Sequence, residues 1–325
     1  MKIYNIAIMG TGNIAAKMAH TLKNMNGVNC YAVGSRNINR AKQFADMHGF
    51  EKSYGSYEEL ASDNNIDLVY IATPHSEHFS GAKLCITNGR AVLIEKAFTV
   101  NARQAIELLK ISKEKNIFVT EAIWTRYMPF LSKIKEIINS GIIGEPTMLT
   151  ANLGYDIDKK ARLTDPNLAG GALLDVGIYV LNFACIIFGS GYKDIVSTCT
   201  YTKTGVDEQD SITMIYEDGK MAVLNSSMLS VSDRKGVIHG DKGFIIIENI
   251  NNFESISVFD NSYNRIVYYE RPGQITGYEY EVYSSIKAIE NGKIECEEMP
   301  HNEIIKLMKI MDELRKTWGI VYPCE

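Results

Sequence analysis

The sequence lacks the long apolar segments that mark a membrane protein. No run of uncharged apolar residues approaches the roughly 18 to 20 that a membrane-spanning helix needs. From Met1 and Lys2 the chain passes directly into a short strand pattern, rather than into the apolar stretch of a signal peptide. We therefore expect a cytoplasmic protein with no membrane partner.

Cysteine pairs and metal-ligand clusters are missing as well. The 6 cysteines are scattered and contain no Cys-x-x-Cys pair, so the sequence indicates neither a zinc site nor a disulfide framework. No acids and histidines have the spacing of metal ligands either. We expect buried or idle thiols and no bound metal.

Positive charge is not in excess. The formal net charge of -5 argues against nucleic acid or an anionic membrane surface as the main partner. What the chain does have is length and apolar content, since its 325 residues, 46% of them hydrophobic, are nearer two domains than one. We expect a soluble two-domain protein that binds a small molecule.

The first part of the chain alternates strand-like and helix-like patterns. Each short apolar run is followed by a segment with helical periodicity. The strand-like runs cover residues 3–9, 28–35, 66–73, 91–98 and 117–122, and the helical patterns start at Asn13, Asn37, Ser76 and Asn101. Strands this apolar are covered on both faces. The alternation predicts an α/β fold, with a Rossmann-type doubly wound parallel sheet in a domain over residues 1–122.

The turn after the first strand carries a dinucleotide-binding pattern, G-x-G-x-x-A, at residues 10–15. The first glycine allows the tight bend, the second lets the backbone approach a pyrophosphate, and the alanine keeps the helix close to the strand. Alone, the string is equally an ordinary glycine-rich turn. Its place between a strand and a helix favours a cofactor site. The candidate residues are Gly10, Thr11, Gly12, Asn13 and Ile14.

The end of the second strand indicates which cofactor binds. An NAD site usually has Asp or Glu there to bind the ribose 2′-hydroxyl, and this chain has neither. Arg36 can fork onto a 2′-phosphate, Ser35 can donate a hydrogen bond, and Arg40 lies one helical turn further on the same side. NADP is favoured over NAD. In the alternative interpretation both arginines are solvated residues at the start of a helix.

A lysine follows one of the buried strands. Residues 91–98 read AVLIEKAF, and the ligands of open parallel sheets bind outside the carboxyl ends of the strands. Lys96 is therefore expected at the mouth of the cofactor cleft, where it suits proton transfer or the tuning of another acid. The alternative is a structural lysine paired with Glu95.

After residue 122 the alternation stops. The pattern gives a helix at 130–140, a strand from about Thr147, a helix after Gly171, then runs of strands, and helices at 278–291 and 301–318. Tight turns at 218–219 and 241–243 predict hairpins, hence a large, open, mostly antiparallel sheet in an α+β domain over residues 123–325. Polar and apolar residues alternate along 211–216, so one face can pack helices and the other is a candidate dimer surface.

Asp175 and Tyr179 are polar residues in the apolar helix predicted after Gly171. They are four residues apart, so they lie on one face, one turn from each other. Polar groups in apolar surroundings need partners, and we expect these in the cleft that contains Lys96. In the alternative interpretation Tyr179 is a half-buried helix tyrosine and Asp175 a charge at a helix N-terminus.

Several ordered motifs resemble one family over essentially the full chain. They are GTGNIA at 10–15, ATPHSEH at 72–78, IEKAF at 94–98 and GGALLDVGIY at 170–179. Together they resemble the glucose-fructose oxidoreductase/inositol dehydrogenase (Gfo/Idh/MocA) family of NAD(P)-dependent dehydrogenases. Within it, EAIWTRYMP at 121–129 and TGVDEQDSITM at 204–214 resemble the branch that contains dimeric dihydrodiol dehydrogenase and D-xylose dehydrogenase.

The resemblance implies catalytic roles. Tyr179 is implied as the proton-transfer residue, Lys96 as the cation that stabilises its phenolate, and Asp175 as the orienting carboxylate, although lysine and tyrosine can exchange roles. Chemistry agrees, because a phenol with its usual pKa of about 10 is a poor base at neutral pH unless an ammonium group lies close. The family commonly has proline after this lysine. This chain has Ala97, which makes a cis peptide bond costly and affects how Lys96 is presented.

The resemblance also implies binding residues. Thr73, Pro74 and His78 match the family's T-P-x-x-x-H pattern and, with His75, Glu95 and Lys96, are candidates for the cofactor site. A structural hydrogen bond explains the histidines equally well. The candidates for the wall of the substrate pocket are aromatic or cationic, with packing as an even alternative: Trp124, Arg126, Tyr127, Tyr155 and Arg162.

These inferences predict an NADP-dependent dehydrogenase that transfers hydride between nicotinamide and a secondary alcohol or hemiacetal carbon. The substrate is a sugar or a cyclic trans-diol, and the protein is a homodimer through the C-terminal sheet. One alternative is a non-catalytic sensor that binds NADP and a sugar on the same scaffold. The sequence argues against it, because it retains Lys96, Asp175 and Tyr179 together. Another is a reductase of an unsaturated substrate such as a tetrapyrrole.

Overall fold

The computed structural model describes residues 2–325. Met1, where the sequence analysis expects the chain to lead directly into the first strand, lies outside the described residues. The described residues form two compact units. The first unit holds the residues up to Tyr127 together with Gln274–Met308, and the second holds Met128–Gly273 together with Lys309–Glu325. A domain boundary at residue 122 stays a prediction.

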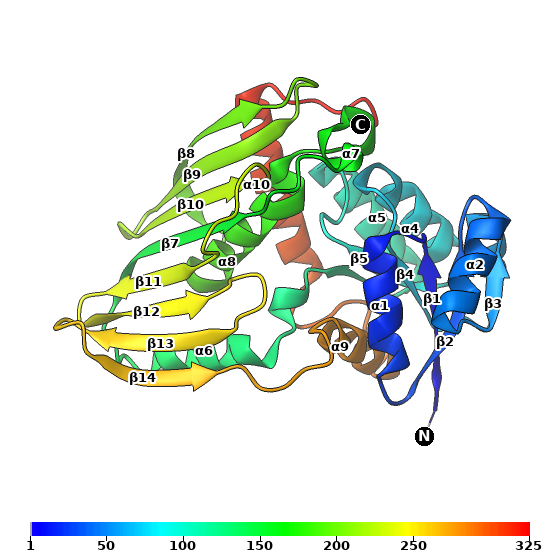
Figure 1. The fold of residues 1–325 in the computed structure, drawn as a ribbon, viewed down its shortest axis with the longest axis horizontal. Helices are drawn as coiled ribbons and strands as arrows, with labels where there is room; N and C mark the ends of the chain where they lie inside the picture. The colour runs from blue at the N-terminus through cyan, green and yellow to red at the C-terminus, as the bar shows by residue number, and fades with distance from the viewer. Residues whose placement is uncertain (1) are drawn as a thin grey trace. The chain divides into compact units, whose positions relative to one another are not determined.

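The first unit is built on a 6-stranded parallel sheet (Figure 1). Its strands are β1 (Tyr4–Met9), β2 (Val28–Gly34), β3 (Lys52–Tyr54), β4 (Leu68–Ile71), β5 (Ala91–Glu95) and β6 (Val119–Ala122). They lie in the order β3-β2-β1-β4-β5-β6, which is that of a doubly wound dinucleotide-binding sheet. Every residue of β4 is buried, as its uninterrupted apolar run predicts. The predicted α/β fold is confirmed, and the sheet has one strand more than predicted, the short edge strand β3.

Side-chain caps set where several helices of this unit begin. Asn37 accepts hydrogen bonds from the backbone N–H groups of Asn39 and Arg40, and Asn101 accepts one from Gln104, so both predicted starts are confirmed. The helices of this unit are α1 (Asn13–Lys23), α2 (Ile38–His48), α3 (Tyr57–Ser62), α4 (His78–Thr87), α5 (Ala102–Lys115) and α9 (Glu279–Glu290). Helix α10 (His301–Trp318) is divided between the two units after Met308.

The second unit is built on an 8-stranded sheet in the order β14-β13-β12-β11-β7-β10-β9-β8. Its strands are β7 (Pro146–Gly154), β8 (Tyr192–Tyr201), β9 (Asp207–Tyr216), β10 (Met221–Ser227), β11 (Gly236–Gly240), β12 (Gly243–Glu248), β13 (Ser255–Asp260) and β14 (Arg265–Glu270). Strands β7 and β10 pair in parallel, and the other neighbours are antiparallel. The predicted open, mostly antiparallel sheet is confirmed.

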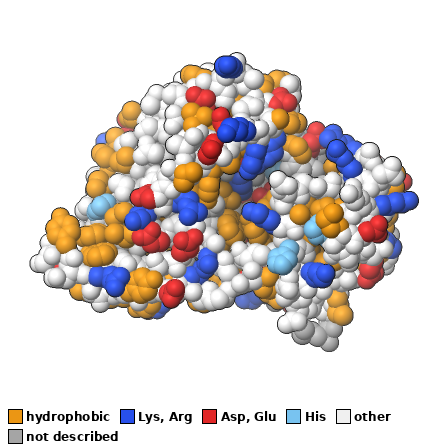
Figure 2. Space-filling view, viewed as in Figure 1, with side chains coloured by type: hydrophobic (Ala, Val, Ile, Leu, Met, Phe, Trp, Pro, Cys, Tyr) orange, Lys and Arg blue, Asp and Glu red, His pale blue; other side chains and the backbone are white. Residues whose placement is uncertain are grey.

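Helices cover one face of this sheet. In β9, Ile212 and Met214 are buried while Ser211 is exposed, which confirms the predicted alternation. Helix α8 (Ile178–Phe188) packs against β7 and β10, and α6 (Pro129–Asn139) and the short α7 (Ala161–Thr164) belong to the same unit. Over β11 to β14, apolar side chains are scattered among charged ones (Figure 2). The second face therefore keeps the mixed character that the sequence predicts.

One stretch corrects the sequence analysis. Residues Pro166–Phe188, which include α8, are long and apolar enough to cross a membrane by length and composition, so the expectation that no such stretch exists is wrong. Its most apolar window is 83% buried inside the protein. The apolar residues pack against the sheet, and the stretch is a core helix.

Candidate active site

The turn between β1 and α1 lies where the strand order of the first sheet reverses. Strand β1 pairs with β2 on one side and with β4 on the other, which is the crevice where doubly wound folds bind ligands. Gly10 has a φ of +109°, and a Cβ there would lie 2.8 Å from the carbonyl oxygen of Ala72. Both the conformation and the space at this turn therefore require glycine.

Gly12 leaves room for an anion. A Cβ added to Gly12 would meet no atom within 4 Å, and α1 begins there with no side-chain cap among residues 2–325 and no acid in its first turn. The first N–H groups of a helix have no partner within it, and the helix dipole adds positive potential. The pyrophosphate of a dinucleotide fits this turn. Thr11, Asn13 and Ile14 complete the turn and the start of α1.

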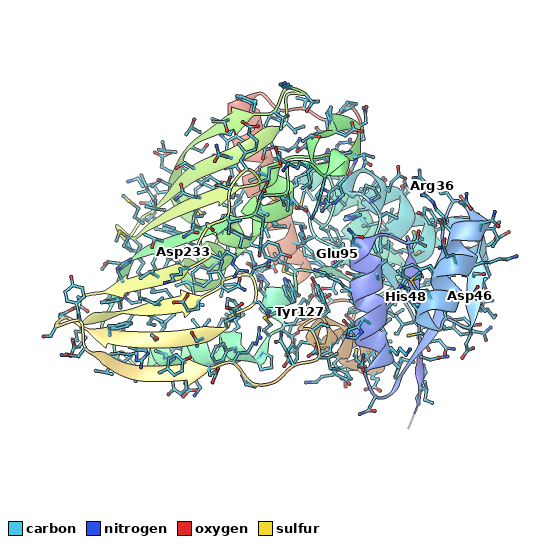
Figure 3. The ribbon with its side chains drawn as sticks, in the orientation of Figure 1. Arg36, Asp46, His48, Glu95, Tyr127 and Asp233 are labelled. Atoms are coloured by element: carbon cyan, nitrogen blue, oxygen red, sulfur yellow. The ribbon has the colours of Figure 1, made fainter. Side chains whose placement is uncertain are left out.

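Cationic side chains lie at the start of α2. Ser35 is buried, and its hydroxyl accepts a hydrogen bond from the N–H of Asn37 at 3.3 Å. Arg36 and Arg40 are exposed, and Arg36 lies near the start of α2 (Figure 3). Burial raises the pKa of the Tyr57 phenol, and the nearby Arg36 guanidinium lowers it. The end of β2 thus offers positive charge to the ribose end of a dinucleotide.

The segment after β4 carries the predicted residues Thr73, Pro74, His75 and His78. The two ring nitrogens of His78 lie 2.8 Å from the carbonyl oxygen of Ala97 and 3.0 Å from that of Thr73. Burial lowers the pKa of the His78 imidazole to about 4, so the neutral ring donates to one of these carbonyls at a time. His75 packs edge-on against it, with ring centroids 5.6 Å apart. His78 thus ties the segment after β4 to the segment after β5.

Lys96 follows β5 directly and is half-buried. Glu95, the last residue of β5, is buried and accepts a hydrogen bond from the hydroxyl of Tyr70. The peptide bond between Lys96 and Ala97 is cis, although residue 97 is not proline. The contact of His78 with the Ala97 carbonyl holds the segment that presents Lys96.

Two buried acids near Glu95 were missed by the sequence analysis. Glu121 in β6 accepts a hydrogen bond from the N–H of Phe98 at 2.8 Å, so it also holds the segment that follows Lys96. Burial raises the pKa of Glu121 to about 7. Glu281 in α9 is 0% exposed, and burial, together with the charge of Glu95, raises the pKa of Glu281 well above its usual range. Glu121 is a single acid in an apolar strand and Glu281 is one of three glutamates in α9, and neither pattern marks a buried site residue.

Trp124 and Arg126 lie in a 3-10 turn (Trp124–Arg126) just after β6. The ring of Trp124 stacks on Tyr278, with centroids 4.4 Å apart. Arg126 is 8% exposed and forms an ion pair with Glu303 at 3.5 Å. These contacts fix the turn, and a substrate contact by either residue stays a prediction.

Asp175 and Tyr179 lie at the start of the core helix of the second unit. Residues Leu173–Gly177 form a π-helical turn, and α8 continues from Ile178. The predicted helix is confirmed, but it begins with a wider turn, a feature often found at functional sites. Asp175 and Tyr179 are 7% and 8% exposed, so both polar groups are largely shielded from water.

Arg162 accompanies Asp175. Both terminal guanidinium nitrogens donate to one carboxylate oxygen of Asp175, at 3.2 and 3.3 Å. Tyr155, the other predicted pocket residue of this unit, is half-buried, and its hydroxyl accepts a hydrogen bond from the Asn251 amide at 3.1 Å. A role for Arg162 or Tyr155 in substrate binding stays a prediction.

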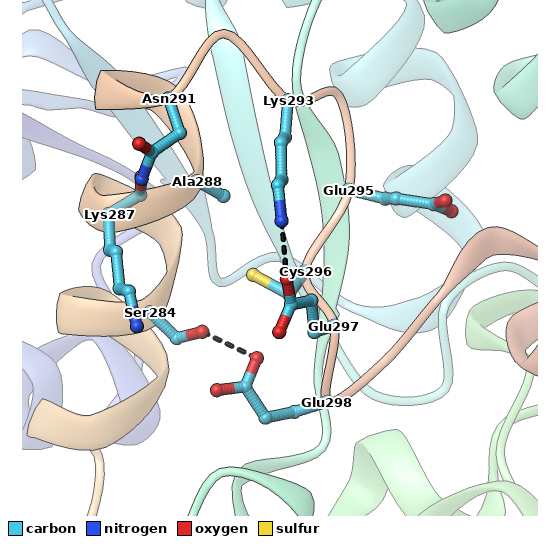
Figure 4. A pocket seen from close by; sticks show the side chains of 9 residues that line it. All are labelled: Ser284, Lys287, Ala288, Asn291, Lys293, Glu295, Cys296, Glu297 and Glu298. Carbon is cyan, nitrogen blue, oxygen red and sulfur yellow. Dashed lines mark hydrogen bonds and ion pairs between the residues drawn. The ribbon is translucent and has the colours of Figure 1, made fainter.

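A separate small hollow lies in the first unit, between the end of α9 and residues 293–298 (Figure 4). Its lining is largely charged and internally paired, for example Lys293 with Glu297 and Ser284 with Glu298. None of the predicted site residues lines it. Among residues 2–325, no group of three or more His, Cys, Asp or Glu side chains could hold a metal ion.

Known proteins resemble this chain along most of its length. Residues 4–122 match the family described as "Oxidoreductase family, NAD-binding Rossmann fold", and residues 131–246 match the "GFO/IDH/MocA C-terminal domain". The trans-1,2-dihydrobenzene-1,2-diol dehydrogenase of Mus musculus is 32% identical over 303 residues, 90% of this chain and 89% of the relative. The protein of the same name from Xenopus laevis is 31% identical over 325 residues, 97% of this chain and 98% of the relative.

Solved structures share the fold. The 3-ketoreductase KijD10 from Actinomadura kijaniata, in complex with NADP and TDP-benzene, has a TM-score of 0.88 at 19% identity over 97% of this chain and 98% of that chain. Levoglucosan dehydrogenase, in complex with NADH and levoglucosan, has a TM-score of 0.84 at 18% identity over 98% of each chain. The predicted resemblance to dihydrodiol dehydrogenase is confirmed by the relatives at 30% identity and above. The chain belongs to the Gfo/Idh/MocA family of NAD(P)-binding oxidoreductases, as its ordered motifs predict.

Proposed function

We propose that the protein is an NADP-dependent dehydrogenase acting on a secondary alcohol or hemiacetal carbon of a sugar or cyclic trans-diol. The observation that carries the proposal is the β1–α1 turn, which leaves room for a pyrophosphate at Gly12 while the end of β2 presents Arg36 in place of an acid. The relative from Mus musculus, named as a dehydrogenase of trans-1,2-dihydrobenzene-1,2-diol, supports the reaction type.

Residues of the first unit would hold the cofactor. The N–H groups at the start of α1 donate to the pyrophosphate, and Arg36 and Arg40, with Ser35, bind the 2′-phosphate through charge-assisted hydrogen bonds. When bound, the nicotinamide takes up or gives hydride. The protein's own part is to orient the alcohol and to move its proton.

We assign the proton transfer to Tyr179. Oxidation of an alcohol releases the hydroxyl proton, and the oxygen of a tyrosine phenolate can accept it. Because a phenol is a poor base at neutral pH, we assign to Lys96 the positive charge that favours the phenolate, and to Asp175 the orientation of the site. The family resemblance supports this assignment, and Arg162 in turn holds Asp175. In the reverse assignment Lys96 moves the proton.

The substrate class is supported by the names of similar proteins. One relative is named for a cyclic trans-diol, and one protein of the same fold is in complex with levoglucosan. A carbon ring that carries hydroxyl groups has apolar faces and polar edges. Trp124 and Tyr155 supply aromatic surfaces suited to such faces, and Arg126 supplies donors suited to a hydroxyl group.

We also propose a homodimer through the open face of the second sheet. Five side chains form a row across neighbouring strands on this face, from Met221 through Met148, His239 and Phe244 to Phe259. Phe244 and Phe259 stack with ring centroids 4.9 Å apart, and the two methionines are 37% and 38% exposed. A row that is apolar apart from His239, on an otherwise mixed open face, favours pairing with a second copy. A monomer in sedimentation would contradict the dimer.

A cytoplasmic location is part of the same proposal. All six cysteines, in the described part of the chain, are free thiols, which suits a reducing compartment.

The decisive experiment measures initial rates of NADP and NAD reduction with D-xylose, D-glucose, myo-inositol and a trans-dihydrodiol, between about pH 6 and 10. We expect reduction of NADP that increases with pH through one basic ionisation. Tight NADP binding without reduction by any substrate of a wide aldose and diol panel would favour the sensor alternative instead.

A further inference from the structure

Two buried aspartates of the second unit, Asp207 and Asp210, have no part in the proposed reaction. They are 0% and 4% exposed, and both lie on β9. Strand residues three apart normally point to opposite faces of a sheet. Here the register of β8 and β9 shifts between Thr200 and Tyr201, and this irregularity turns Asp207 to the same face as Asp210. That face carries the core helix.

Asp207 binds the first turn of the helix that contains Asp175. Its carboxylate accepts a hydrogen bond from the backbone N–H group of Leu173. Gly171 makes room for it, because a Cβ there would lie 2.3 Å from an oxygen of Asp207. Asp207 therefore caps the N-terminus of the π-helical turn from a strand that follows it in the chain.

Asp210 lies beside the same turn. One of its oxygens accepts a hydrogen bond from the Ser226 hydroxyl at 2.7 Å, and a Cβ at Gly177 would lie 3.3 Å from that oxygen. The remaining oxygen of Asp207 and that of Asp210 are buried with no N–H or O–H partner among residues 2–325. These two oxygens belong to carboxyl groups that lie beside the same helical turn and act on each other's pKa, so one proton shared between them would satisfy both.

The surroundings favour one negative charge on the pair rather than two. Burial raises the pKa of both carboxyl groups, and the charge of Asp207 raises that of Asp210 further. The N–H of Leu173 and the charge of Arg315 favour the ionised form of Asp207, although Arg315 is also paired with Glu325. Asp207 is thus the ionised member, and Asp210 is the protonated member that donates to it.

We propose that Asp207 and Asp210 form a proton-sharing pair that fixes the π-helical turn and thereby positions Asp175 and Tyr179. The inference rests on the proposed dehydrogenase function. Both aspartates are positioning residues, because they act through the backbone of residues 172–177. The ionised carboxylate of Asp207 holds the Leu173 N–H at the start of the helix, and the proton on Asp210 removes the repulsion that a second charge would bring.

Asparagine substitutions separate the two roles. Asp210→Asn keeps an N–H donor toward Asp207, so its kcat should stay within about threefold of wild type. Asp207→Asn replaces the charged acceptor at the helix start with a weaker one, so its kcat should fall at least about tenfold while NADP affinity is kept. The exposed Asp194→Asn on β8 is the matched control. Equal kcat in Asp207→Asn and Asp194→Asn would overturn the proposal.

Two readouts do not depend on turnover. Hydrogen–deuterium exchange over residues 170–180 should accelerate in Asp207→Asn and stay near wild type in Asp210→Asn. The infrared difference spectrum between wild type and Asp210→Asn at neutral pH should show a protonated carboxyl band, since the bands of the buried Glu121 and Glu281 are shared by both proteins and cancel. This comparison does not need a folded Asp207→Asn. Absence of the band, or unchanged exchange in a folded Asp207→Asn, would overturn the pair. If wild type reduces no cofactor but both readouts behave as expected, the proposed function fails and the pair stands.

Discussion

Arg162 donates both terminal guanidinium nitrogens to the same oxygen of Asp175, at 3.2 and 3.3 Å. The Asp175 side chain is largely shielded from water, so its carboxylate relies on protein partners, of which Arg162 is one. The Arg162 side chain is 46% exposed, and solvent screening weakens the ion pair accordingly. The contact is what we expect if Arg162 orients Asp175. While it donates to Asp175, the guanidinium group has fewer N–H donors left for a substrate.

Replacement of Arg162 distinguishes these two roles. If Arg162 orients Asp175, Arg162→Met should lower kcat about fivefold to tenfold with KM nearly unchanged, because substrate binding is kept while the site is less ordered. Steady-state kinetics at saturating NADP measures this split. Lys160→Met, a change at a nearby exposed cation, should behave as wild type. A higher KM at constant kcat would instead assign Arg162 to the substrate.

Cofactor choice depends on Arg36. Arg36→Ala should weaken NADP binding by about 1.5 to 3 kcal/mol, the scale of a charge-assisted hydrogen bond, and leave NAD binding nearly unchanged. Fluorescence titration of both reduced cofactors measures the two affinities. Arg265→Ala, which removes an exposed arginine of β14, is the control. Equal losses for NADP and NAD would show that Arg36 does not bind the 2′-phosphate.

The cofactor turn could be predicted from sequence because its determinants are local. Gly10, Gly12 and the helix start at Asn13 are neighbours in the chain, and their spacing, together with their place between a strand and a helix, indicates a turn that lets a phosphate approach the backbone. The caps at Asn37 and Asn101 were predictable for the same reason. The doubly wound parallel sheet was predictable from the alternation of strands and helices, which leaves few topologies.

The groups that support the site could not be predicted, because they come from distant parts of the chain. Glu121 reaches the N–H of Phe98 only once β6 lies beside β5. Asp207 reaches the N–H of Leu173 only because the pairing of β8 and β9 is irregular near Asp207. Residues 173–177 themselves therefore do not indicate the π-helical turn. The expectation about apolar stretches failed at residues 166–188 for a related reason. Composition alone does not show whether lipid or a sheet covers an apolar helix.

Glu121 gives a prediction about stability and pH. Burial raises its pKa from 4.5 to about 7, so the folded state holds the proton more tightly than the unfolded state. The stability that this group contributes is fully present below pH 4.5 and is lost as the pH increases through about 7. Glu121→Gln removes the titration but keeps an oxygen for the Phe98 N–H. Above neutral pH the variant should be more stable than wild type by about 1 to 3 kcal/mol.

Urea unfolding between about pH 5 and 8 checks this prediction, because the difference between variant and wild type isolates one group from the other buried acids. The advantage of Glu121→Gln should shrink toward the acidic end. Glu114→Gln, at an exposed residue of α5, should show no such trend. A stability difference that is constant with pH would mean that Glu121 does not titrate in this range.

The proposed proton transfer is tested by replacing Lys96 and Tyr179, one at a time, with residues that cannot ionise. Lys96→Met and Tyr179→Phe should each lower turnover by at least about a hundredfold while NADP binding is kept, because both groups act on the proton and neither holds the cofactor phosphates. Near-wild-type turnover in either variant would remove that residue from the mechanism. Tyr216→Phe, which removes a phenol hydroxyl that donates to the Gly189 carbonyl oxygen, is a matched control for the tyrosine.

The residual activity of these variants also decides which residue moves the proton. If Tyr179 is the base and Lys96 supplies the charge, the basic ionisation in the pH–rate profile should move to higher pH in Lys96→Met, because the phenolate loses its cation. In Tyr179→Phe the ionisation should disappear. If Lys96 is the base, the opposite holds, since Tyr179→Phe keeps an ionisation near its wild-type pH and Lys96→Met loses it. The two profiles together therefore separate the assignments even though both variants are slow.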